Sequence, residues 1–181
     1  CSSDLANMVA KAAPDGYTFL YAATNSQVYR LVLSSNTPYD PVRDFTSISM
    51  LSDAVLVLAV PANSPIRNMR DYVEQARAGK MFYGTSGVGT SHHLSAELLQ
   101  LVANVKMTHV PFKDPNLVAT EMIADRLTSG FGIFGTMYQH HTAGKLRILA
   151  INNSKRYART PDIPTMTEGV PAYEPPPGWN G

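Results

Sequence analysis

Apolar runs and stretches of helical periodicity alternate along most of this 181-residue chain. Short runs rich in aromatic and β-branched residues predict strands, and AVLVLAVP at residues 54–61 has the length of a buried strand. We expect strands at residues 17–24, 46–51, 54–61, 81–86, 107–112, 130–135 and 146–152. Spaced apolar positions predict helices at residues 5–13, 28–33, 63–79, 93–102, 116–128 and 136–144. This alternation predicts an α/β fold, with a largely parallel sheet and helices on both faces.

Two of the predicted helices carry specific signals. Asn63 or Ser64 is expected to cap the helix at residues 63–79, and Gly79 is expected to end it. In the helix that follows residue 92, apolar residues at helical spacing predict one buried face, made of Leu94, Leu98, Leu101 and Val102.

Composition and charge narrow the classes of function. The formal net charge is +1, and Lys and Arg are scattered without a basic stripe, so nothing in the sequence indicates nucleic-acid binding. No apolar run approaches the ~20 residues of a membrane-spanning helix. The single cysteine excludes an intramolecular disulfide and a zinc site built from cysteines. That residue, Cys1, fits either the acylated start of a bacterial lipoprotein or an arbitrary boundary of the segment.

The loop GTSGVGTSH at residues 84–92 is the strongest candidate for chemistry. Its glycines permit close backbone approach, and its hydroxyl groups come from Thr85, Ser86, Thr90 and Ser91. Thr90 or Ser91 can cap the following helix. The free N–H groups and partial positive charge of a helix N-terminus suit a carboxylate or a phosphate. A plain connecting turn is the alternative interpretation.

Three sharper motifs fail at this loop. A phosphate-binding P-loop requires a lysine after its last glycine, and this loop has none. The dinucleotide-binding fingerprint requires a glycine where His92 stands, and the serine nucleophile elbow requires one where Val88 stands. A small-acid site made of backbone N–H groups and hydroxyls remains, because such a site needs no cationic side chain.

The histidines do not indicate a metal site. His92 with His93, and His140 with His141, are adjacent pairs whose members point in different directions on a helix. We expect His92 or His93 to donate a hydrogen bond to a ligand or to the backbone. His109, in an apolar strand, and Glu97, one turn into the helix, are expected to be structural.

A second polar loop follows the first predicted strand. Asn25 and Ser26 end the run YTFLYAAT, and ligands of open α/β sheets bind beyond the carboxyl ends of strands. An ordinary polar strand-end loop is the alternative. No carboxylate pair and no Ser/His/Asp set with suitable spacing suggests hydrolysis.

Five stretches, in the same order, resemble one protein family. They are VAKAAPDGYTFLYAATNS, YDPVRDFTSISML, LVLAVPANSPIRNMRDYVEQARA, YGTSGVGTSHHLSAELLQLVANVKMTHVPFK and GKLRILAINNSKRYARTPDIPTMTEGVPAYE. The family is the solute-binding receptors of bacterial tripartite tricarboxylate transporters, also called Bug proteins. The resemblance covers nearly all of this chain, which would form only the middle of the family's length.

The resemblance implies a type-2 periplasmic binding-protein fold, in which crossing strands join two α/β lobes. Residues 1–58 and 148–181 would belong to the first lobe, and residues 59–147 to the second. Members of this family lie in the periplasm, capture small carboxylates and pass them to membrane transporter subunits. The resemblance implies no enzymatic activity, no cofactor and no metal.

The resemblance also implies which residues contact the ligand. The second lobe would contribute Thr85, Ser86, Gly87, Gly89, Thr90, Ser91, His92, Phe134 and Thr136. The first lobe would contribute Thr24, Asn25 and Ser26. The family usually has Asp residues around the strand at residues 130–135, where this chain has Gly132 and Gly135.

Parts of the family's first lobe would lie outside these residues, before Cys1 and after Gly181. We therefore expect a first lobe that is incomplete and weakened, or one that a dimer completes. The expected function is that of a periplasmic receptor segment that captures a small organic carboxylate. The alternatives are a non-binding structural fragment of such a receptor and a small serine-dependent hydrolase that uses Ser86 or Ser91 with a histidine.

Overall fold

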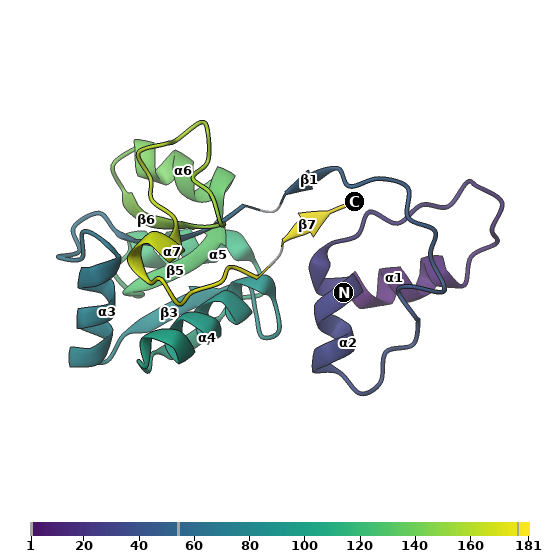
Figure 1. Ribbon diagram of the computed structural model, residues 1–181, viewed down its shortest axis with the longest axis horizontal. Coiled ribbons are helices and arrows are strands. Elements are labelled where there is room, and N and C mark those ends of the chain that lie inside the picture. The colour runs from purple at the N-terminus through teal and green to yellow at the C-terminus, as the bar shows by residue number, and fades with distance from the viewer. Residues whose placement is uncertain (1, 54, 177) are drawn as a thin grey trace. The chain divides into compact units, whose positions relative to one another are not determined.

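The chain forms two compact units in the computed structural model, which describes residues 2–53, 55–176 and 178–181 (Figure 1). Unit 1 comprises Cys1–Ala54 and Pro177–Gly181, and unit 2 comprises Val55–Pro176. The expected lobe boundaries stay a prediction, and in this structure residues 148–176 belong to unit 2. Cys1, considered as a lipidation site, and Ala54, the expected start of a strand, lie outside the described residues.

A five-stranded sheet in the order β4-β3-β5-β2-β6 forms the centre of unit 2. Its strands are β2 (Leu56–Pro61), β3 (Phe82–Thr85), β4 (Thr108–Pro111), β5 (Ser129–Ile133) and β6 (Leu146–Asn152). β3 pairs in parallel with β4 and β5, whereas β2 pairs antiparallel with β5 and β6. The expected largely parallel sheet is therefore mixed. Crossover helices connect the parallel strands, whereas β2 carries the chain into unit 2 without a preceding crossover.

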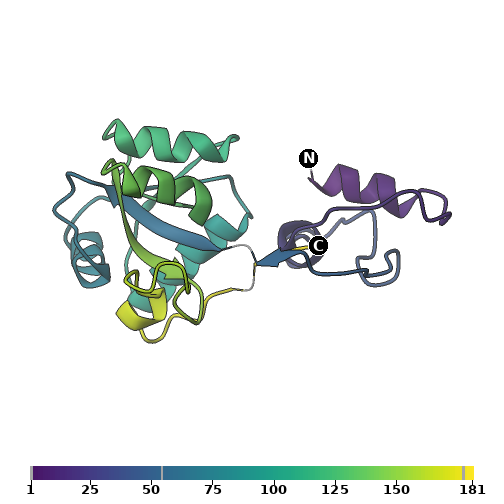
Figure 2. The ribbon, with the colours of Figure 1, turned by 90° about the horizontal axis from the view of Figure 1, so that it is seen from above.

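Helices cover both faces of this sheet (Figure 2). One face carries α3 (Met69–Ala78), α4 (Ser91–Ala103) and α7 (Met166–Gly169), and the other carries α5 (Pro115–Ile123) and α6 (Phe134–Thr142). Leu58 and Val60 of β2 pack into the first core, and Val57 and Ala59 pack into the second. β2 is buried on both faces because successive side chains of a strand point to opposite sides.

α3 begins later than the sequence predicts. Its cap is Asn68, whose side chain accepts a hydrogen bond from the backbone N–H of Asp71 at 2.9 Å, and neither Asn63 nor Ser64 fills this role. The Asp71 carboxylate in turn accepts a hydrogen bond from the N–H of Arg67 at 2.8 Å. This pair satisfies two backbone N–H groups at the start of the helix, which favours the later start.

The buried face of α4 also differs from the prediction. It consists of His92, Ser95, Ala96, Leu99 and Ala103. Of the predicted residues, Leu98 and Val102 are partly buried against the first core, whereas Leu101 is 77% exposed. Small side chains let the helix approach the sheet closely. The polar Ser95 is tolerated there because its hydroxyl accepts a hydrogen bond from the Asn152 side chain at 3.1 Å.

Unit 1 contains helices and a two-stranded sheet. Its elements are α1 (Ser2–Ala10), the π-helix η1 (Asn25–Tyr29), α2 (Arg30–Leu33), β1 (Ser52–Asp53) and β7 (Trp179–Asn180). The strands predicted at residues 17–24 and 46–51 are wrong, since only Ala23 forms an isolated bridge, with Asn180. A strand needs a hydrogen-bonded neighbour, and among the described residues the segment 17–21 pairs with none, which leaves Tyr17, Phe19 and Tyr21 exposed.

Candidate functional site

Four strands of the unit 2 sheet end at one edge. Thr85, Pro111, Ile133 and Asn152 end β3, β4, β5 and β6, and the start of β2 pairs with the ends of β5 and β6. α4, α5 and α6 each follow one of these strands directly, so their N-termini lie at this same edge. The N–H groups of a first helical turn have no partner within the helix, and ligands of α/β sheets bind at such an edge.

The loop between β3 and α4 turns through two glycines. Gly87 has φ +118° and Gly89 has φ +75°, a region that glycine adopts without strain. The sequence predicted Thr90 or Ser91 as the cap of α4, and the cap is Thr90. Its side chain accepts a hydrogen bond from the His93 N–H at 3.4 Å. Its hydroxyl donates to the Gly87 carbonyl at 2.8 Å. These contacts hold the loop against the first turn of α4.

Two hydroxyl groups at the start of the loop are hydrogen-bonded to histidines. The Thr85 hydroxyl lies 2.6 Å from Nε2 of His109, and the Ser86 hydroxyl lies 2.5 Å from Nδ1 of His92. Burial lowers the pKa of His92 to about 4, so this ring is neutral at neutral pH. The loop is therefore held by neutral imidazole groups.

His93 joins the loop to a cluster of aromatic and acidic side chains. Its ring stacks on His109 with the centroids 4.3 Å apart, and His109 stacks on Tyr83 at 5.0 Å. Nε2 of His93 lies 3.7 Å from the Glu97 carboxylate, which accepts a hydrogen bond from the Tyr83 hydroxyl at 2.5 Å. Burial and, to a lesser degree, the charge of His93 lower the pKa of His109.

His93 accepts a hydrogen bond at one of its ring nitrogens. Nδ1 accepts the Gly89 N–H at 3.3 Å, and the expectation that His92 or His93 donates a hydrogen bond to a ligand or to the backbone stays a prediction. The sequence predicted a helix cap at this loop but not the hydrogen bond that His93 accepts, because the direction of the His93 ring depends on its stacking on His109 of β4. His109 and Glu97 are hydrogen-bonded within unit 2, as expected for structural residues.

The remaining unit 2 candidates lie at the start of α6. Phe134 is half-buried, stacks on Tyr138 with the centroids 4.9 Å apart, and donates its N–H to the Val55 carbonyl at 2.9 Å. Thr136 is half-buried in the first turn of this helix. The fold thus brings the unit 2 candidates to the same edge of the sheet, although 42 residues (134 − 92) separate His92 from Phe134 in sequence.

The unit 1 candidates lie at the start of η1. The buried Thr24 hydroxyl accepts a hydrogen bond from the Trp179 N–H at 2.8 Å, and the buried Ser26 hydroxyl donates to the Ala23 carbonyl at 3.0 Å. Asn25 is half-buried between them. The two hydroxyls thus have partners inside unit 1, and the ligand contacts expected of Thr24, Asn25 and Ser26 stay a prediction.

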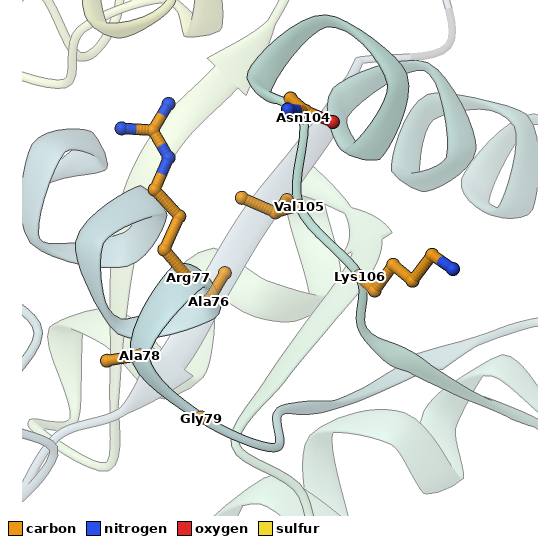
Figure 3. Close-up of a pocket in the computed structure, with 7 residues that line it drawn as sticks. All are labelled: Ala76, Arg77, Ala78, Gly79, Asn104, Val105 and Lys106. Atoms are coloured by element: carbon orange, nitrogen blue, oxygen red, sulfur yellow. The ribbon is translucent and has the colours of Figure 1, made fainter.

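A surface pocket of about 490 Å³ lies at the other end of α4 (Figure 3). It is lined by the end of α3 and by Asn104, Val105 and Lys106. Arg77 donates a hydrogen bond there to the Ala103 carbonyl at 3.1 Å, which satisfies the C-terminus of α4. α4 has 13 residues, so this pocket lies about 20 Å from the loop.

Two features are absent from residues 2–53, 55–176 and 178–181. In this part of the chain, no group of three or more His, Cys, Asp or Glu side chains is placed to hold a metal ion. None of its helices is both long enough and apolar enough to cross a membrane.

Comparison with known proteins places the chain in a family. Residues 5–175 match the Tripartite tricarboxylate transporter family receptor. The chain belongs to this receptor family. It is 35% identical over 165 residues to a UPF0065 protein of Cupriavidus necator, with 90% of this chain and 50% of that protein covered. It is 29% identical over 171 residues to a UPF0065 protein of Bordetella bronchiseptica, with 94% and 51% covered. The chain spans about half the length of these curated relatives.

Solved structures show the same fold. A structure described as a periplasmic transporter matches with a TM-score of 0.87 and 28% identity, over 99% of this chain and 61% of that one. The R. palustris protein Rpa4515, whose structure is described as containing adipate, matches with a TM-score of 0.85 and 31% identity, over 98% and 60%. The expected periplasmic binding-protein fold and the resemblance to Bug receptors are therefore confirmed, with this chain as a partial segment. The family consists of receptors, which agrees with the expectation of a non-enzyme.

Proposed function

We propose that the chain is part of a periplasmic receptor that captures a small organic carboxylate. The receptor would deliver its ligand to the membrane subunits of a tripartite tricarboxylate-type transporter. The observation that carries this proposal is the match of residues 5–175 to the receptor family. The adipate in the R. palustris structure, at 31% identity, supports a carboxylate as the class of ligand.

In this proposal a carboxylate group binds at the loop Thr85–His92. The loop carries no formal positive charge, since the Thr85 and Ser86 hydroxyls contact neutral imidazoles. Its positive potential comes from the N-terminus of the 13-residue helix α4. Backbone N–H and hydroxyl groups form short, charge-assisted hydrogen bonds with a carboxylate. Phe134 and Thr136 supply an apolar surface and a further hydroxyl from the same sheet edge. Binding requires neither a cofactor nor a metal.

The double variant Ser86→Ala with Thr90→Ala tests this assignment. We expect adipate affinity, measured by titration calorimetry, to fall roughly tenfold or more, because hydrogen bonds to a charged group contribute about 1.5–3 kcal/mol each. The matched control is Thr120→Ala with Thr142→Ala, two exposed hydroxyl residues on α5 and α6 away from the loop. Thermal melts of both variants show whether the loss of the Thr90 cap weakens the fold itself.

The outcomes separate the parts of the proposal. Unchanged affinity in the loop variant would refute the assignment of the loop while leaving the receptor function intact. A thermal-shift screen with a panel of di- and tricarboxylates tests the ligand class. If none of these acids stabilises the protein, the chain is better described as a non-binding structural fragment of a receptor.

A further inference from the structure

His93 occupies a backbone donor of the proposed carboxylate site. Its Nδ1 accepts the Gly89 N–H at 3.3 Å, at the point where the loop meets α4. Gly89 has a positive φ, so its N–H direction is fixed by a backbone conformation that few other residues adopt. The imidazole therefore takes the place that an anionic acceptor would take.

This hydrogen bond depends on the protonation state of the ring. A neutral imidazole can accept at Nδ1 only when its proton is on Nε2, which here faces the Glu97 carboxylate at 3.7 Å. A doubly protonated ring donates from both nitrogens, so Nδ1–H would oppose the Gly89 N–H. Protonation thus breaks the hydrogen bond and leaves two N–H donors and a positive charge beside the loop.

Titratable groups from three elements lie around His93. The titratable groups that face it are Glu97 from α4, His109 from β4 and, through Glu97, Tyr83 from β3. The Glu97 carboxylate lies beside Nε2 of the ring. Burial keeps His109 neutral by lowering its pKa, so the stacked neighbour adds no opposing charge at neutral pH. The His93 side chain is 19% exposed, which gives protons access from solvent.

We propose that His93 is a positioning residue that couples carboxylate binding at this loop to the uptake of a proton. The neutral ring holds the Gly89 N–H, and the protonated ring releases it and adds a donor of its own. By linkage, a bound carboxylate must then raise the affinity of His93 for a proton, just as the proton raises affinity for the carboxylate. This inference rests on the proposed function, because it assigns a role to His93 at the same site.

Titration calorimetry with adipate, in buffers of different ionisation enthalpy at about pH 7, measures the protons taken up per ligand bound. We expect the full chain to take up a substantial fraction of a proton, and His93→Asn, which keeps a polar group at the position of Nδ1, to take up almost none. The matched control His140→Asn, on α6 and outside the loop, should retain the uptake. Adipate's own protonation is the same for every variant. The Gly89 amide signal in NMR spectra should also shift as His93 titrates without ligand, and should stay fixed in His93→Asn.

Each outcome has a defined meaning. Adipate binding without proton uptake, or with uptake that His93→Asn retains, overturns the role of His93 and leaves the proposed function standing. If no acid of the panel binds, both fall. Should His93→Asn fail to fold, His93→Gln replaces it, since glutamine also carries no titrating group. Proton uptake that His93→Gln retains would overturn the proposal.

Discussion

Three histidines gather at the start of α4, and each has a different environment. His92 is buried against Ser86, His93 accepts a backbone N–H, and His109 reaches Thr85 from the neighbouring strand. The sequence shows that these histidines are present, and the capping role of Thr90 could be predicted from it. The direction of each ring could not, because it depends on strand pairing that places His109 beside Tyr83.

The burial of His92 predicts a pH-dependent stability. Its pKa falls from the ordinary 6.5 to about 4 in the folded state, so the unfolded chain binds more protons between these values. Stability is then complete above about pH 6.5 and falls as the pH decreases toward about 4, by up to about 3 kcal/mol. Chemical unfolding at a series of pH values measures this loss. In His92→Asn, which has no titrating ring, the loss between about pH 7 and pH 5 should be clearly smaller, and an identical loss would contradict the assignment.

Elements were predicted with uneven success. The buried strand β2, the strand β3 and the strand β6 follow from their apolar runs, because a strand buried in a sheet leaves a continuous apolar signal. The buried face of α4 was predicted only in part. Leu98 and Val102 pack against the first core, but the fully buried Leu99 was missed. The buried His92 and Ser95 were also missed, because their burial depends on hydrogen bonds to Ser86 and Asn152. The distance of α5 from the sheet was also not predictable, because it depends on glycines in β3 and β5.

α5 packs closely on the sheet at Gly130. A Cβ at this position would lie 2.5 Å from Cγ1 of Val118, a β-branched side chain with little freedom to move. We expect Gly130→Ala to destabilise unit 2 by about 1–3 kcal/mol, as overpacked cores do. Gly135→Ala on α6, with nothing within 4 Å of the new Cβ, is the control and should be nearly neutral. Urea unfolding of both variants measures the difference, and equal midpoints would argue against close packing here.

At the scale of the whole molecule, the two units differ in how well they bury their apolar side chains. Unit 2 has two apolar cores and a five-stranded sheet. Unit 1 exposes large apolar side chains such as Tyr17, Val32, Val42 and Ile48. Its described residues also include buried polar atoms without a hydrogen-bond partner, on Asn7, Gln27, Arg30 and Thr37. Both features lower the stability of a unit, so unit 1 is expected to open first.

Limited proteolysis with trypsin tests this difference. We expect early cleavage at Lys11 and Arg43 of unit 1, and slower cleavage at Lys80 and Lys145 of unit 2, which are also exposed. Mass spectrometry of the fragments identifies the order of the cuts. Simultaneous cleavage in both units would contradict the expectation. Protection of Lys11 and Arg43 that increases with protein concentration, together with a dimer mass in sedimentation, would instead indicate that a second copy completes the first lobe.

The sequence by itself determined the α/β class, the main strands of unit 2, the capped loop after β3 and the receptor family. These depend on local periodicity, on turn chemistry and on the order of motifs along the chain. The tertiary structure alone decided the antiparallel placement of β2, the absence of strands at residues 17–22 and 46–51, and the histidine contacts of the loop. Each of these depends on a partner distant in sequence: a strand exists only with a neighbour, and an imidazole binds whichever group the fold places within reach of its nitrogens.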